Sequence, residues 1–195
     1  MTNIYIYIYI YIYIYIMGIG KKNRGGNVAL KLNMTKAYDR VSWIFLINVL
    51  RAFGFGERCI DMVWRLISNP WFSILINGMP FGFFSSSRGL RQGDPLSPSL
   101  FIVGAEVLSR LLNQLLLHPR FNGFKVPQGC PLVSHLGYAD DILIFSIASI
   151  VSLKLLMETL EKYENVSGQR INASKSCFMV HPQLSQSRKA SIQSI

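Results

Sequence analysis

The sequence contains few residues of the kinds that build disulfide frameworks or zinc sites. Its 195 residues include only three cysteines and three histidines. Cys59, Cys130 and Cys177 lie far apart, no Cys-x-x-Cys pair occurs, and the histidines are equally scattered. A disulfide framework is therefore excluded, and no zinc-ligand pattern is present.

Acidic residues are also scarce. The chain has 10 Asp and Glu against 20 Lys and Arg, which gives a formal net charge of +10. Such a balance favours a polyanionic partner, because each phosphate that a basic side chain neutralises releases counterions. Nucleic acid is the natural candidate. A surface charge that only keeps the protein in solution is the other interpretation, and composition does not decide between them.

A membrane span is not expected. Residues 141–157 are apolar enough to suggest one, but acidic residues open the segment, Lys154 interrupts it, and its spacing changes midway from strand-like to helical. A buried strand followed by a helix is the better interpretation. The start of the chain shows neither a basic leader nor a small-residue cleavage site, so we expect no secretory signal and an intracellular protein.

The first residues form a low-complexity segment. Isoleucine and tyrosine alternate without exception over residues 4–16, which leaves no polar face to set a strand register. Alternating Ile and Tyr codons are what a TA dinucleotide repeat encodes. The segment has high β-propensity, no charge and no proline, so it is an aggregation hazard, although a real edge strand is the alternative. We expect residues 1–20 to lie outside the fold.

From Gly26 onward the pattern is typical of one globular domain with a two-layer α+β fold, in which helices cover one face of a mainly antiparallel sheet. Trp43, Trp64 and the phenylalanines are expected in the core. The second helix is expected to carry Met62, Val63 and Leu66 on one face. The expected elements are a strand at 28–32, a helix capped by Ser42 that runs to Phe53, a helix at 57–67, a hairpin of 71–76 with 81–84 around Asn77-Gly78, a helix from Ser99 to Pro119, strands at 132–137 and 142–145, a helix at 150–166 and a strand at 177–180.

The most informative feature is the sequence Tyr138-Ala139-Asp140-Asp141 between the apolar strands expected at 132–137 and 142–145. Two adjacent carboxylates repel each other in a tight turn unless a cation neutralises them, so the pair suggests a metal-dependent site. Ordinary turn chemistry is the alternative, because Asp is common in turns. The four residues alone leave both interpretations open.

Three further segments accompany the acidic turn in a fixed order. They are KLNMTKAYDRV at residues 31–41, GLRQGDPLSP at 89–98 and SGQRINASKS at 167–176. With YADD at 138–141 they resemble the reverse transcriptases of plant LINE-type (non-LTR) retrotransposons, over about residues 26–187. The resemblance implies a palm-like domain, with a ferredoxin-like or RRM-like sheet, that is a fragment of a right-hand polymerase. We expect no fingers, thumb or endonuclease in this chain.

The resemblance implies a chemistry and a set of partners. Such polymerases add deoxynucleotides to a primer 3′ hydroxyl on an RNA template and use two Mg²⁺ ions held by three aspartates. Asp140 and Asp141 match two of these metal ligands, and the third position carries Asn33. The expected partners are an RNA template, a DNA primer and deoxynucleoside triphosphates. Because Asn33 has no negative charge, we expect polymerase activity to be absent or nearly so, and Asp39 is not an obvious replacement.

Other positions carry over from the resemblance with a structural alternative beside each. Tyr38 matches the bulky residue beneath the incoming sugar, although it could be a core aromatic. Gln92 and Gly93 match the loop that approaches nucleotide and template, where plain turn chemistry is the alternative. Lys175 matches a lysine near the triphosphate, or is a solvated surface lysine. A noncatalytic nucleic-acid-binding remnant and a pseudogene product without function are the alternatives to a polymerase domain.

Overall fold

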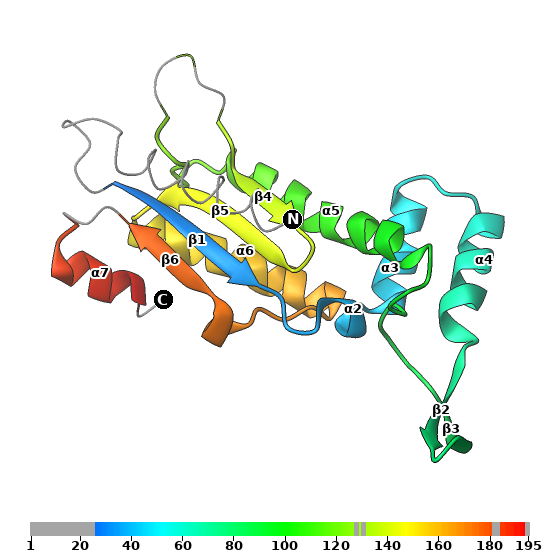
Figure 1. Cartoon of the computed structure of the whole chain (residues 1–195). Coiled ribbons are helices and arrows are strands. Elements are labelled where there is room, and N and C mark those ends of the chain that lie inside the picture. Colours follow the sequence, from blue (N-terminus) through cyan, green and yellow to red (C-terminus); the bar gives the residue numbers. More distant parts are fainter. Residues whose placement is uncertain (1–25, 127–128, 130–131, 181–183, 194–195) are drawn as a thin grey trace. The chain divides into compact units, whose positions relative to one another are not determined.

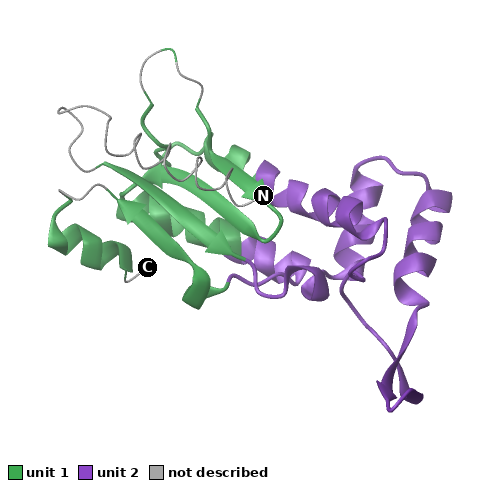
Figure 2. Cartoon of the chain, in the orientation of Figure 1, with its two compact units in different colours: residues 1–33, 111–160, 172–195 green, residues 34–110, 161–171 purple. Residues whose placement is uncertain are grey.

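The structure is a computed structural model that describes residues 26–126, 129, 132–180 and 184–193 (Figure 1). The chain divides into two compact units (Figure 2). Unit 1 comprises residues 1–33, 111–160 and 172–195, and unit 2 comprises residues 34–110 and 161–171. The low-complexity residues 4–16 lie outside the described residues.

Unit 1 is built on a four-stranded antiparallel sheet with the order β4-β5-β1-β6. The strands are β1 (Asn27–Asn33), β4 (His135–Tyr138), β5 (Asp141–Ile147) and β6 (Cys177–Val180). With helices before β4 and after β5, this is the strand order of a ferredoxin-like β-α-β-β-α-β fold. The predicted α+β class is confirmed.

The two faces of this sheet have different environments, because successive strand residues point to opposite sides. Val28 is completely buried and shares a cluster with Leu153 of α6 (Ile150–Ser167) and Ile192 of α7 (Gln186–Gln193). The next residue of β1, Ala29, lies on the opposite face in a cluster with Phe124. Helices therefore cover one face, while a connecting segment covers part of the other.

The apolar segment 141–157 forms strand β5 followed by the first part of helix α6, as predicted. No helix among the described residues is both long and apolar enough to cross a membrane. The predicted strand at 132–137 is shorter and later than expected. It is β4, His135–Tyr138, so that only Ala139 and Asp140 separate it from β5.

Unit 2 is mostly helical and includes one separate hairpin. Its elements are α2 (Ala37–Arg40), α3 (Trp43–Ala52), α4 (Glu57–Ser68), β2 (Trp71–Ile76), β3 (Met79–Ser85) and α5 (Ser97–Leu115), of which α5 runs on into unit 1 as α6 runs on into unit 2. Ser42 caps α3 as predicted, since its hydroxyl accepts a hydrogen bond from the Phe45 amide at 3.3 Å. The helix stops before Gly54, which has φ +85°.

The β2–β3 hairpin forms around Asn77-Gly78 as predicted, but its side chains are not in the core. Phe83 is 70% exposed, and most of the other apolar side chains of the hairpin are also exposed. A two-stranded sheet has no helix layer of its own to bury either face. The prediction that the phenylalanines belong to the core is therefore wrong for this hairpin.

Helix α4 also differs from its predicted apolar face. Ile60 and Val63 are buried, whereas Met62 and Leu66 are exposed. The buried stripe follows i and i+3 from Ile60, so of the three residues predicted to share one face only Val63 belongs to it. Trp64 is likewise 41% exposed and touches Trp43, which is buried as expected.

Candidate functional site

The acidic turn of unit 1 is a tight connection with an unusual backbone. Tyr138 and Asp141 pair across β4 and β5, so Ala139 and Asp140 alone make the turn. Ala139 has φ +51°, in the left-handed region that glycine prefers. A non-glycine residue pays about 1–2 kcal/mol there. Backbone strain of this kind is concentrated at functional sites, which makes the turn a candidate site.

Asn33 faces this turn from the end of β1, an interior strand of the sheet. It is the last residue of β1 and pairs in register with Asp141 of β5. Its side-chain Nδ2 donates hydrogen bonds to Asp140 Oδ2 at 2.9 Å and to Asp141 Oδ1 at 3.1 Å. The structure thus brings together the three positions at which the resemblance implies catalytic aspartates. The side-chain amide of Asn33 bridges the carboxylates of Asp140 and Asp141.

Lys31 completes the cluster, although the sequence analysis did not single it out. It lies two residues before Asn33 on β1, so both side chains are on the same face of the sheet. Its Nζ is 3.4 Å from Asp141 Oδ2, and both side chains are less than one-third exposed. Strand alternation was the signal that could have identified it. The repulsion between the two aspartates is reduced by a cationic and an amide donor of the chain itself.

Lys175 lies on a short turn that adjoins the end of β1. The Asn172 amide donates to the Asn33 carbonyl at 2.7 Å, and the Asn33 amide donates to Ser176 Oγ at 3.2 Å. Between them, Ala173–Lys175 form a single 3-10 turn, labelled η1. Lys175 is itself exposed. The bonds to both backbone groups of Asn33 explain how the segments 31–41 and 167–176 meet in the fold.

The donor set does not fit a metal centre of three carboxylates. A hard cation such as Mg²⁺ binds oxygen acceptors, and carboxylates are the strongest of these. Here Asn33 directs an N–H donor at both carboxylates. Among the described residues no group of three or more His, Cys, Asp or Glu side chains is placed to hold a metal ion. A cation at the turn would have to displace the amide from both aspartates.

Tyr38 belongs to unit 2, on the short helix α2. Its ring stacks on Phe101 of α5, with centroids 4.9 Å apart and planes 6° from parallel. Its carbonyl accepts a hydrogen bond from the Leu90 amide at 2.8 Å. Beside this bond, a Cβ on Gly89 would lie 2.7 Å from the Asp39 carbonyl oxygen, so only glycine allows the approach. The segment 89–98 therefore packs directly on the backbone that carries Tyr38.

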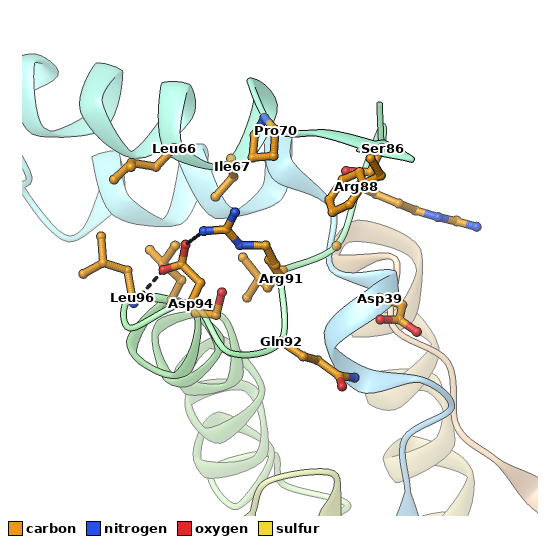
Figure 3. A pocket seen from close by; sticks show the side chains of 15 residues that line it. Asp39, Leu66, Ile67, Pro70, Ser86, Arg88, Arg91, Gln92, Asp94 and Leu96 are labelled. Atoms are coloured by element: carbon orange, nitrogen blue, oxygen red, sulfur yellow. Dashed lines mark hydrogen bonds and ion pairs between the residues drawn. The ribbon is translucent and has the colours of Figure 1, made fainter. Parts of the chain in front are cut away.

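Gln92 lines a cavity of about 520 Å³ in unit 2, together with Asp39 (Figure 3). Gly93, the next residue, has φ +89°. Apolar side chains from the end of α4 face the cavity, including Leu66 and Ile67, and Arg91 projects between them and the start of α5. The cavity combines an apolar wall with polar groups from the loop before α5.

Arg91 is held in that loop by Asp94. Its Nη2 is 2.8 Å from Asp94 Oδ2, while Asp94 Oδ1 accepts a hydrogen bond from the Leu96 amide at 2.9 Å. The Leu96 N–H and then the Arg91 guanidinium keep the pKa of Asp94 below its usual value, against the opposing effect of partial burial. Asp94 thus orders the loop that carries Gln92 and Gly93.

Known proteins are similar to the chain in sequence or in fold. The family model for reverse transcriptase (RNA-dependent DNA polymerase) matches residues 12–192. A retrovirus-related Pol polyprotein from the type-2 retrotransposable element R2DM of Drosophila melanogaster is 32% identical over 149 residues, which is 76% of this chain and 13% of the relative. A 149 kDa protein of transposon TX1 from Xenopus laevis is 30% identical over 80% of this chain and 11% of its own length.

Among solved structures, apo telomerase from Candida tropicalis truncated from its C-terminal domain superposes with a TM-score of 0.60 at 15% identity, over 82% of this chain and 31% of that truncated chain. At that identity the likeness concerns the fold, which is that of a right-hand polymerase. The chain spans less than one-third of this structure and about one-eighth of the Drosophila polyprotein. The resemblance inferred from its motifs is confirmed at the level of the family, and the chain belongs to the reverse transcriptases, as a domain of the non-LTR retrotransposon kind.

Proposed function

We propose that this chain is a reverse transcriptase domain that lacks polymerase activity. The observation that carries the proposal is the pair of hydrogen bonds from Asn33 Nδ2 to Asp140 and Asp141. In the family, the corresponding positions present three carboxylates to two Mg²⁺ ions. Here one of them presents an N–H donor, and the set has one negative charge fewer.

The size of the expected defect follows from metal-site chemistry. Changing a group that only orients a metal ligand costs about 10- to 100-fold in affinity or activity. Loss of a ligand carboxylate itself removes a charge and a bond to the metal, so we expect a loss of at least about 100-fold. Asp140 and Asp141 would be the remaining metal ligands. Lys31, 3.4 Å from Asp141, further offsets the negative charge that a cation would meet.

The remaining assignments in this proposal rest on the family. Tyr38, Gln92 and Gly93 contact the incoming nucleotide, Lys175 approaches its triphosphate, and the partners are an RNA template, a DNA primer and deoxynucleoside triphosphates. A telomerase that shares the fold was solved with a fragment of telomeric RNA, which supports RNA as the template. We propose residues 26–187 as the palm fragment. A plant origin is supported by 51% identity over 67 residues to an uncharacterized mitochondrial protein of Arabidopsis thaliana.

A second function is supported by the charge of the chain. The excess of basic residues gives a net charge of +10, which suits a domain that binds RNA or an RNA–DNA duplex without acting on it. Backbone contacts of this kind hold a duplex without reading its sequence. A product without any function is the remaining alternative, and it predicts neither extension nor specific retention of nucleic acid.

The test is primer extension by the full chain on an RNA template with Mg²⁺ and deoxynucleotides. The natural chain, the Asn33→Asp variant and the Asn33→Asp, Asp140→Ala double variant are compared. We expect no extension above background from the natural chain, a gain of about 100-fold or more from Asn33→Asp, and loss of that gain in the double variant. Extension by the natural chain that disappears in an Asp140→Ala single variant would refute the proposal. Silence from every variant would show that Asn33 is not the sole defect.

A further inference from the structure

The backbone that carries Tyr38 is braced by the segment that follows α6, residues 167–171. Thr35 donates its amide hydrogen to the Arg170 carbonyl at 2.7 Å, and Ser42 donates to the Ser167 carbonyl at 2.8 Å. These two bonds enclose α2 from both ends. A residue within the same segment, Gln169, reaches the first residue of α2 with its side chain. All of these residues belong to unit 2.

Gln169 makes this contact from inside the unit. It is 2% exposed, and its Nε2 donates to the carbonyl of Ala37, the residue before Tyr38, at 2.8 Å. The backbone amide of Gln169 donates to Ser167 Oγ at 3.1 Å, which fixes the backbone position from which the side chain extends. The donor half of the Gln169 amide thus holds the carbonyl oxygen on one side of the Tyr38 peptide unit.

The oxygen of the same side-chain amide has no such hydrogen bond within the described residues. Gln169 Oε1 is buried and has no hydrogen-bond partner among the described residues. A buried acceptor without a partner is unfavourable, and each such group in a native structure needs an explanation. An apolar side chain of the same volume would fill the space without that penalty. Filling the core therefore does not account for a glutamine at this position.

The contacts of Tyr38 itself show what Gln169 could control. The Tyr38 carbonyl accepts from Leu90, and the ring lies flat on Phe101. With the peptide before Tyr38 held by Gln169 and the peptide after it held by Leu90, the direction of the Tyr38 side chain is set on both sides. We propose that Gln169 is a positioning residue for Tyr38, which fixes the ring that meets the sugar of a bound nucleoside triphosphate. The functional half of this inference rests on the proposed nucleotide site.

The experiment compares the full-length natural chain with Gln169→Met, which keeps the volume and removes the donor. Tyr163→Phe is the matched control, because it removes another buried hydrogen bond of the same unit, from the Tyr163 hydroxyl to the Gly104 carbonyl at 3.4 Å. Each chain is labelled with 3-fluorotyrosine, and the Tyr38 resonance is assigned by its loss in Tyr38→Phe. Fluorine NMR then reports the environment of the ring, and urea unfolding reports stability.

We expect Gln169→Met to shift or broaden the Tyr38 resonance while its midpoint of unfolding changes no more than that of Tyr163→Phe, because it removes both a buried hydrogen bond and the unpaired Oε1. Tyr163→Phe should leave the resonance in place. An unmoved Tyr38 resonance in Gln169→Met would overturn the inference, and so would an equal shift in both variants, since that would reveal only a general loosening of the unit.

A second measurement addresses the nucleotide. Equilibrium binding of deoxyadenosine triphosphate and adenosine triphosphate is compared in the natural chain and in Gln169→Met. A contact that excludes a hydroxyl by shape gives at most about 100-fold selectivity, so we expect the preference for the deoxy form to fall by roughly tenfold. An unchanged preference together with a moved resonance would refute the functional half. Failure of both nucleotides to bind the natural chain would count against the proposed nucleotide site, and the ring signal would still decide whether Gln169 positions Tyr38.

Discussion

At the scale of the residue, the chain shows how one side chain changes the character of a polar cluster. Asn33 has the shape of the aspartate that the family resemblance implies, yet it acts as a donor to both neighbouring carboxylates. The motifs predicted which positions would meet, and Asn33, Asp140 and Asp141 do meet in the structure. The motifs did not predict the ion pair between Lys31 and Asp141, which becomes apparent only when the register of β1 is known.

Gly168 gives a prediction at the same scale. It has φ +76°, and a Cβ there would lie 2.7 Å from the Arg40 carbonyl oxygen. Gly54 has φ +85° with nothing near its Cβ position, so Gly54→Ala measures the conformational cost alone. We expect Gly54→Ala to lower the free energy of unfolding by about 1–2 kcal/mol. Gly168→Ala should cost at least about 1 kcal/mol more, because backbone must shift to relieve the contact.

Urea unfolding of both variants, followed by circular dichroism, checks this prediction. Equal losses of stability would mean that residues 167–171 can move away from α2 without cost. That result would also weaken the view that this segment braces the backbone at Tyr38.

At the scale of the element, local patterns predicted most helices and strands, and burial was the harder property. Ser42 as a cap and Asn77-Gly78 as a turn act through bonds and backbone angles within a few residues, so their sequence is sufficient. Whether β2 and β3 are covered depends on what packs against them, which no local pattern contains. The exposed apolar hairpin and the outward-facing Trp64 are errors of this second kind.

The loop before α5 gives a prediction in terms of pH. Hydrogen bonds from Leu96 and Arg91 lower the pKa of Asp94 in the folded chain. A group whose folded pKa is lowered stabilises the fold above its unfolded pKa, near 3.9, and loses that contribution as pH falls through the folded value. We therefore expect this part of the stability to be constant at neutral pH and to disappear below about pH 4.

The measurement is the free energy of unfolding of the natural chain and Asp94→Asn between about pH 3 and pH 6, a range chosen around the usual aspartate pKa. Asparagine keeps an acceptor for the Leu96 amide but does not titrate. The difference between the two chains should shrink as the pH falls. A difference that is the same throughout would mean that the Asp94 charge does not stabilise the loop.

At the scale of the whole molecule, charge is the property most easily tested. The net charge of +10 predicts nucleic-acid binding that weakens steeply with salt, because each phosphate contact contributes a slope of about 0.9 in log affinity against log salt. Four such contacts would reduce the affinity roughly 100-fold between about 50 and 200 mM salt. Fluorescence anisotropy with an RNA–DNA duplex measures this slope, and single-stranded and double-stranded DNA of equal length are the controls.

The same loss of affinity with all three ligands would indicate general electrostatic attraction. A preference for the hybrid duplex that persists at the higher salt would indicate a surface shaped for it. Affinity that does not change with salt would contradict the interpretation of the basic charge as a nucleic-acid footprint.

The position of β1 in the middle of its sheet also affects how the protein is made. Asn33 and its partner Asp141 are 108 positions apart, and β6 follows later still. At ~5–20 residues per second, a ribosome needs roughly 5 to 20 s to add the residues between them. Throughout that time β1 has no strand to pair with, while the apolar β2–β3 hairpin has already been synthesised. We therefore expect the pairing of β1 with β5 to form late and to limit the rate of folding, because the long loop must close before any of its contacts stabilise the sheet.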